Sequence, residues 1–87
     1  MIWKQKYVVT DNKEMIVFSE LIQHKEFKSF NPTSAGFISI FVKDGQTDCL
    51  CYGESISLGL KSYEEKDTYM AKRQILGHPP YLSNERQ

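Results

Sequence analysis

The dipeptide Asp44-Gly45 constrains the fold of this chain more than any other feature. It lies between two runs rich in β-branched and aromatic residues, residues 36–43 and 46–52. Both central residues of a type I′ turn need positive φ, and Asp-Gly is among the pairs that supply it most readily. The sequence therefore predicts a two-residue β-hairpin, and a loop this short also sets the register of its two arms.

This register divides the hairpin into two faces. On one face it pairs Val42 with Thr47, Ile40 with Cys49 and Ile38 with Cys51, and on the other Phe41 with Asp48, Ser39 with Leu50 and Phe37 with Tyr52. The first face is small and apolar, and we assign it to the core. The second face carries Phe37, Phe41, Leu50 and Tyr52 among polar residues.

An earlier hairpin is predicted over residues 2–18. Residues 2–10 and 14–18 are typical of strands, and Asp11-Asn12-Lys13 supplies the turn. A three-residue turn places Val9 opposite Met15, Tyr7 opposite Val17 and Val8 opposite Ile16. The hairpin is apolar on both faces, so we expect it to be central or covered on both sides.

Two helices and one further strand complete the prediction. The first helix spans residues 20–29 with Ser19 as its N-cap, and the second opens with the capping box Ser62-x-x-Glu65 and stops at Gly77. The second helix is expected to turn Tyr63, Met70, Ala71, Ile75 and Leu76 inward. Between the helices, SISLGL alternates, which predicts a strand with Ile56, Leu58 and Leu60 on its buried side.

The order ββα-ββ(β)α predicts an α+β domain with two layers. Its sheet has four or five mostly antiparallel strands, with both helices on one face. The length of 87 residues fits one domain, which we place at residues 1–77, followed by an irregular tail over 78–87.

Charge and composition narrow the class of partner and the compartment. Eleven basic and eleven acidic residues leave no net charge, which argues against a non-specific nucleic-acid binder and offers little resistance to self-association. There is no apolar run long enough for a membrane span and no signal-peptide pattern, so we expect a soluble cytoplasmic protein. The two cysteines, Cys49 and Cys51, are too few for a secreted disulfide scaffold.

The Cys49-x-Cys51 pair has two interpretations. Residues i and i+2 of a strand point to one face, so both sulfurs could bind one zinc ion, with His24 and His78 as the only imidazoles. In the predicted register, however, both cysteines pair with isoleucines, as buried free cysteines do when they pack as small hydrophobic residues. We favour packing and expect no metal or other cofactor.

No catalytic signature stands out. Residues 53–57, GESIS, have part of a G-x-S-x-G nucleophile elbow but lack its last glycine. His24 could act as a general base, although a solvent-facing histidine on a charged helix is the commoner case. A small enzyme would need a pocket that joins Glu54, Ser55 or His24 to a second titratable group. We expect a non-catalytic binding domain.

The aromatic hairpin face formed by Phe37, Phe41, Leu50 and Tyr52 is the candidate binding site. If no helix covers it, an apolar patch of this kind marks an interface with a second copy or with another protein. The alternative ligand is single-stranded nucleic acid stacked on the rings, with Lys4, Lys6 or Lys43 nearby. The remaining interpretation is that residues 20–30 or the tail cover this face as a second core layer.

Three segments carry a resemblance. At EMIVFSELIQHKEF, SAGFISI and CYGESISLGLKS the chain resembles small bacterial proteins of uncharacterised function, over most of residues 7–75. The resemblance implies a compact bacterial intracellular domain. It carries over no activity and no site residues.

Overall fold

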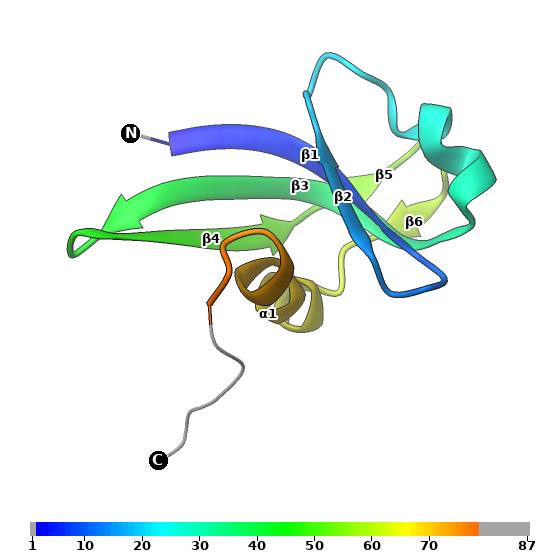
Figure 1. The fold of residues 1–87 in the computed structure, drawn as a ribbon. Coiled ribbons are helices and arrows are strands. Elements are labelled where there is room, and N and C mark those ends of the chain that lie inside the picture. The colour runs from blue at the N-terminus through cyan, green and yellow to red at the C-terminus, as the bar shows by residue number, and fades with distance from the viewer. Residues whose placement is uncertain (1, 79–87) are drawn as a thin grey trace.

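The computed structural model describes residues 2–78, which form an α+β fold with an antiparallel four-stranded sheet (Figure 1). The predicted tail at residues 78–87 lies outside the described residues except for His78. The elements, in chain order, are β1 (Ile2–Thr10), β2 (Met15–Phe18), the 3₁₀ helix η1 (His24–Phe30), β3 (Pro32–Lys43), β4 (Gln46–Tyr52), β5 (Glu54–Ser55), β6 (Leu60–Lys61) and α1 (Glu64–Gln74).

The main sheet has the strand order β2-β1-β3-β4, and both predicted hairpin registers are confirmed. Asp44 and Gly45 have φ of 53° and 77°, as a type I′ turn requires. The long strand β3 also pairs with β1 along nearly its whole length, from Phe41 opposite Ile2 to Pro32 opposite Thr10. Each hairpin therefore contributes one strand to the centre of the sheet.

The sheet has two apolar faces because successive side chains of a strand alternate. We call one of them the α1 face, since its buried side chains, which include Tyr7, Ile38 and Cys51, pack with Ala71 of α1. The opposite face we call the η1 face. Its cluster of Val8, Phe18 and Ala35 is covered by Phe27 of η1 and by side chains of the β5–β6 segment.

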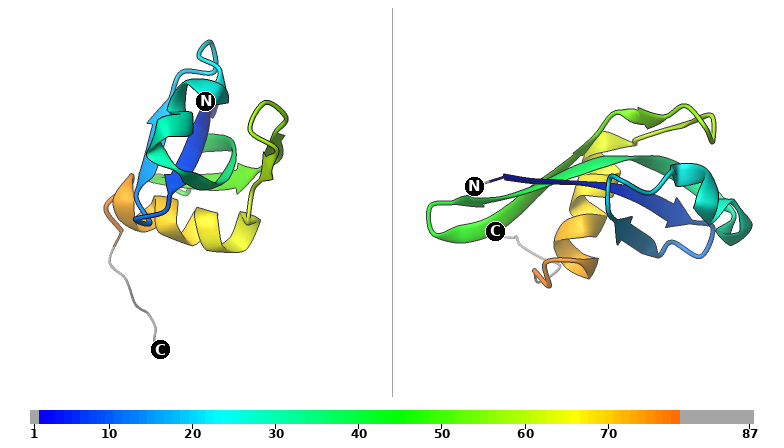
Figure 2. Two further views of the ribbon diagram at one scale, coloured as in Figure 1. Left: turned by 90° about the vertical axis from the view of Figure 1, so that its right-hand side faces the viewer. Right: turned by 90° about the horizontal axis from the view of Figure 1, so that it is seen from above.

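The two helices thus lie on opposite faces, and the prediction of both helices on one face is wrong. Figure 2 shows α1 crossing one side of the strands and η1 lying at one end of them. The physical reason is the two-sided apolar pattern of the first hairpin. With Tyr7 and Val9 pointing one way and Val8 the other, neither face can be left to water.

The predicted helix over residues 20–29 is a turn followed by η1. The Ser19 hydroxyl does accept the N–H of Leu21, but Leu21 is 92% exposed and the helix begins only at His24. His24 is buried, against the prediction that it faces solvent, and its Nε2–H donates to the Gly36 carbonyl at 2.8 Å. Phe27 packs on Phe18 with ring centroids 4.2 Å apart, which anchors η1 to the sheet.

The predicted strand over residues 55–60 is a small hairpin instead. Only β5 and β6 are extended, with Glu54 opposite Lys61, and residues 56–59 form the turn between them. Gly59 adopts φ of 67° within this turn, and Ile56, which the alternation placed inside, is 87% exposed. Leu58 and Leu60 do pack against the η1 face.

Helix α1 starts on a buried polar network rather than on the predicted capping box. Tyr7 donates its hydroxyl proton to Asp67 Oδ2 at 2.6 Å, and the Ser62 hydroxyl bonds to the Tyr7 oxygen at 2.6 Å. The N–H of Tyr63, the N-cap residue, donates to the same Asp67 oxygen. Tyr63, predicted to point inward, is exposed, whereas Asp67 is fully buried.

The remaining residues predicted to line the inner side of α1 divide into two groups. Ala71 is buried, and Met70 and Leu76 pack at the margin of the α1-face cluster, while Ile75 is exposed. Gly77 has φ of 72°, and the N–H of His78 returns to the Lys72 carbonyl, so the predicted glycine stop is confirmed.

Candidate interaction surface

One end of the sheet is only partly covered by other elements. We call it the free end and define it by residues 2–5, 39–43 and 46–50. In Figures 1 and 2 the start of β1 and the β3–β4 turn project away from η1 and past α1. Both packed clusters, built around Tyr7 and around Val8, lie toward the other end.

On the α1 face the free end exposes large apolar side chains. Trp3 is 63% exposed and Val42 is 64% exposed, although Val42 was assigned to the core. The two flank an open apolar hollow of about 180 Å³, also lined by Ile40, Phe41 and Thr47. The alternation at residues 36–43 is correct, but α1 crosses the strands at the middle of the sheet and does not cover the last pair of the hairpin (Figure 2). The core therefore ends near Ile40.

On the η1 face lie the four residues predicted from the hairpin pattern. Phe37, Phe41 and Tyr52 are half-buried, and Leu50 is 51% exposed. No helix of the described residues covers Phe41 or Leu50, and Ile2, directly opposite Phe41, is 68% exposed. The structure therefore brings Phe41 and Leu50 together with Ile2, a residue that the hairpin pattern did not include.

Phe37 and Tyr52 are engaged with their neighbours. Their rings stack at 6.0 Å between centroids, and the Tyr52 hydroxyl bonds to Ser39 Oγ at 3.0 Å. Lys4 Nζ sits 4.8 Å from the centre of the Phe37 ring, and His24 meets that ring edge-on. Phe37 and Tyr52 are thus packed against neighbouring side chains next to the free end. Ile2, Phe41 and Leu50 form the exposed apolar surface of this face.

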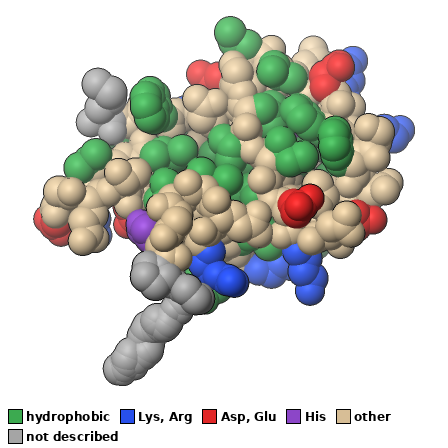
Figure 3. Space-filling model, in the orientation of Figure 1, with side chains coloured by type: hydrophobic (Ala, Val, Ile, Leu, Met, Phe, Trp, Pro, Cys, Tyr) green, Lys and Arg blue, Asp and Glu red, His purple; other side chains and the backbone are tan. Residues whose placement is uncertain are grey.

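Figure 3 shows one side of the molecule, on which hydrophobic side chains run from the end where β1 begins toward the centre of the sheet. Trp3 and Ile2 belong to β1 and were not singled out from the sequence. Their signal was available in the strong alternation of residues 2–9, which places Trp3 on the face of Tyr7 and Ile2 on the face of Val8. What the alternation could not show is that the covering elements stop short of them.

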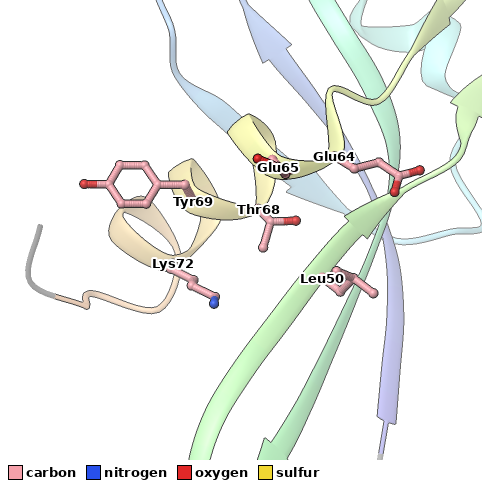
Figure 4. Close-up of a pocket in the computed structure, with 6 residues that line it drawn as sticks. All are labelled: Leu50, Glu64, Glu65, Thr68, Tyr69 and Lys72. Atoms are coloured by element: carbon pink, nitrogen blue, oxygen red, sulfur yellow. The ribbon is translucent and has the colours of Figure 1, made fainter. Parts of the chain in front are cut away.

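A groove runs between β4 and α1 beside Leu50. It is an open hollow of about 380 Å³ lined by Leu50, Glu64, Glu65, Thr68, Tyr69 and Lys72. Figure 4 shows Thr68 and Lys72 directed toward β4, and Tyr69 directed away from it. The groove is the seam along which α1 covers the outer edge of the sheet.

The exposed backbone along this seam is hydrogen-bonded by side chains. Thr68 Oγ1 accepts the N–H of Cys51 at 2.8 Å, and Asp48 Oδ1 accepts the N–H of Cys49 at 2.8 Å. Lys72 holds Asp48 in an ion pair at 3.4 Å. An unprotected strand edge invites pairing with another chain, so these contacts block strand addition at β4.

The edge of β2 is capped by Gln74 where the strand begins. Its Oε1 accepts the N–H of Met15 at 2.9 Å, and its Nε2 donates to the carbonyl of Lys13 at 2.8 Å. β2 pairs only with Lys6–Val9 of β1. The edge of β1 from Ile2 through Gln5 therefore has no neighbouring strand on that side within residues 2–78.

Cys49 and Cys51 are free thiols buried under α1, as the packing interpretation expected. Burial raises the pKa of both thiols, and that of Cys51 rises to about 12 with a further contribution from nearby Cys49. A thiol with a raised pKa is a poor nucleophile and a poor metal ligand. Within residues 2–78 there is no group of three or more His, Cys, Asp or Glu side chains placed to hold a metal ion.

The catalytic candidates do not converge. Ser55 is buried and uses its hydroxyl to accept the N–H of Leu58 within the β5–β6 turn. The hollow beside it contains Glu54 and Lys61 but not His24. Burial lowers the pKa of His24, against the opposing effect of its bond to Gly36, so this ring serves as a neutral packing group under η1.

The fold and the site together define a small α+β domain with a partly uncovered antiparallel sheet. No helix of the described residues is long and apolar enough to cross a membrane. Comparison with family models, with curated proteins and with solved structures finds no match to this chain.

Proposed function

We propose that this protein is a non-catalytic interaction domain that binds a protein partner through the free end of its sheet, and that the partner is a second copy of the same chain. One observation carries the proposal. Ile2, Trp3, Val42 and Leu50 each expose more than half of their surface at one end of the sheet, while the other end is packed on both faces. Exposed apolar groups gathered in this way are typical of protein-binding surfaces.

The geometry of the free end favours a protein over a small ligand. Its apolar groups lie on both faces, with Trp3 and Val42 on the α1 face and Ile2 and Leu50 on the η1 face. A small molecule contacts one concave site, and the hollow beside Trp3 holds only about 180 Å³. Covering both faces of a strand end requires an extended partner surface.

Single-stranded nucleic acid is the other class of partner that the aromatic face suggested. Base stacking needs free ring faces and nearby cations. Here Phe37 and Tyr52 stack on each other, Lys4 already lies over Phe37, and Lys6 donates to the Ile22 carbonyl. The observations therefore favour a protein partner.

Sedimentation velocity over a range of protein concentrations, from low micromolar to near millimolar, tests the proposal. We expect a monomer–dimer equilibrium. Trp3→Ser should weaken it by at least about tenfold, because buried tryptophans contribute most strongly to interfaces. Ile56→Ser is the matched control, since Ile56 is 87% exposed but lies in the β5–β6 turn away from the free end.

Two outcomes would overturn the proposal. One is a wild-type protein that stays monomeric at every concentration. The other is a dimer weakened by Ile56→Ser but not by Trp3→Ser. Titration with a single-stranded oligonucleotide at low salt is run in parallel, and tight, steeply salt-dependent binding would favour the nucleic-acid alternative instead.

A further inference from the structure

The backbone of β1 provides a pairing edge at the free end. β2 stops opposite Lys6, so β1 continues beyond it from Ile2 to Gln5 with no strand on that side within the described residues. On the other edges of the main sheet, side chains cap the N–H groups of Cys49 and Cys51 in β4 and of Met15 in β2. The β1 edge from Ile2 to Gln5 is therefore the more open position for strand addition.

The pairing pattern shows which backbone groups are available there. The N–H of Thr10 donates to the Glu14 carbonyl, and the Thr10 carbonyl accepts the N–H of Lys13. The backbone groups of Thr10 therefore point toward β2. Alternate residues of a strand point to the same neighbour, and β1 is regular from Ile2 to Val9. The N–H and C=O groups of Lys4 and Ile2 therefore point outward at the open edge.

The other side of the sheet gives the same assignment independently. The N–H groups of Cys49 and Cys51 point away from β3 and donate to side chains. The backbone N–H and C=O of Leu50, which lies between them, therefore point toward β3 and its partner Ser39. The backbone N–H and C=O of Ser39 then point toward β4 and not toward Lys4, its neighbour on β1. The backbone N–H and C=O of Lys4 must accordingly point away from β3.

We infer that two copies of the chain associate by antiparallel pairing of their β1 edges about Trp3, a mode of association that rests on the proposed function. In this register Ile2 of each copy pairs with Lys4 of the other, and each such pair exchanges two hydrogen bonds. Trp3 falls opposite Trp3 at a non-hydrogen-bonded position, where side chains are closest. All the outward groups of Ile2 and Lys4 are used, and neither copy runs into β2.

Self-pairing is favoured over another occupant because the edge is self-complementary. A two-fold axis perpendicular to the sheet keeps both α1 helices on one face and brings the two indoles together on that face. The strands β4-β3-β1 of one copy would then continue into those of the other. With no net charge, no long-range repulsion opposes the pairing.

The area available sets the expected strength. A tryptophan buries roughly 150–250 Å², and Ile2 adds one exposed aliphatic side chain on the β1 edge of each copy. The total falls below the roughly 800 Å² per partner of a standard interface. The dimer is therefore expected to be weak and concentration-dependent, in the class of transient complexes.

A pair of variants at Lys4 tests the pairing mode. Lys4→Pro removes the outward N–H while leaving the bonds of β1 to β3 intact, and proline is tolerated at such edge positions. Lys4→Ala removes the same side chain, including its contact with Phe37, but keeps the N–H. We expect Lys4→Pro to weaken dimerisation at least about tenfold relative to Lys4→Ala, because each copy loses a donor and leaves a carbonyl unpaired.

Circular dichroism supplies the controls. Unchanged far-ultraviolet spectra and melting of dilute Lys4→Pro would show that the fold is kept; if it is lost, the pair Ile2→Pro and Ile2→Ala takes its place by the same reasoning. The wild-type dimer should also show an exciton couplet from the paired indoles, which Lys4→Pro abolishes.

Equal dimerisation of the proline and alanine variants, with Trp3→Ser still disruptive, would overturn strand pairing but leave the proposed function standing. A wild-type monomer at all concentrations would overturn both.

Discussion

At the scale of single residues, Tyr7 connects the sheet to α1. It is fully buried, and its hydroxyl lies between Ser62 Oγ and Asp67 Oδ2. Burial and the nearby Asp67 carboxylate raise the pKa of Tyr7 well above its usual value, so the hydroxyl keeps its proton and remains a donor. Asp67 Oδ1 is buried with no hydrogen-bond partner in the described part of the chain, which makes the Tyr7 bond to Oδ2 more important.

Tyr7→Phe should lower the free energy of unfolding by about 1–3 kcal/mol. The substitution preserves the ring packing but removes the donor to a buried carboxylate, and it leaves Ser62 without its partner. Urea denaturation at neutral pH measures the change. Tyr52→Phe is the matched control, because its hydroxyl bonds only to half-buried Ser39. An equal loss in both variants would contradict the role assigned to the network.

The Tyr7 network was not predictable from local pattern. Ser62 was interpreted as the start of a capping box, and an acidic residue such as Asp67 in the first turn of a helix suits the helix dipole without any tertiary partner. Both side chains instead bond to a residue more than fifty positions earlier in the chain. Hydropathy and spacing report neighbours along the chain, so they do not reveal a polar partner brought in by tertiary packing.

At the scale of elements, the hairpins were predictable because short turns set them. Asp44-Gly45 determines the β3–β4 pairs, and the three-residue turn at Asp11 determines the β1–β2 pairs. The segments at 20–29 and 55–60 lack such a local constraint. SISLGL alternates as a strand does, but β5 ends at Ser55 and the chain then reverses in a turn. Gly59 adopts positive φ in that turn.

Helix α1 protects the outer edge of β4 as well as packing on the sheet. Thr68→Val should therefore lower the free energy of unfolding by about 1–2 kcal/mol, because it leaves the N–H of Cys51 without its acceptor at nearly constant volume. Thr47→Val is the control, since Thr47 is exposed at the far end of β4. Thermal melting of the two variants compares them, and equal melting temperatures would contradict the capping role of Thr68.

At the scale of the whole molecule, the sheet is longer than its covering layers. The sequence predicted an aromatic face at Phe37, Phe41, Leu50 and Tyr52 but left open whether other elements cover it, and the structure leaves Leu50 exposed and the other three half-buried. The extent of the free end on both faces followed from where η1 and α1 pack on the sheet. No pattern within β1, β3 or β4 encodes those positions.

This arrangement leaves the free end less covered than the rest of the sheet. Stability is concentrated where α1, η1 and β5–β6 pack, and the free end contributes exposed apolar area to the monomer. Pairing two β1 edges would bring Ile2 and Trp3 of the two copies into contact and use the outward backbone groups of β1. On this account association completes the sheet without requiring a change of fold.

The emission spectrum of Trp3 tests this account most directly, because Trp3 is the only tryptophan of the chain and lies at the centre of the proposed pairing. A tryptophan that is mostly exposed in the monomer should emit at long wavelength in dilute solution. As the concentration rises through the range in which sedimentation detects dimers, its emission should shift to the blue and its quenching by acrylamide should fall. An unchanged spectrum and unchanged quenching across that range would show that association leaves Trp3 in water, and would contradict the account.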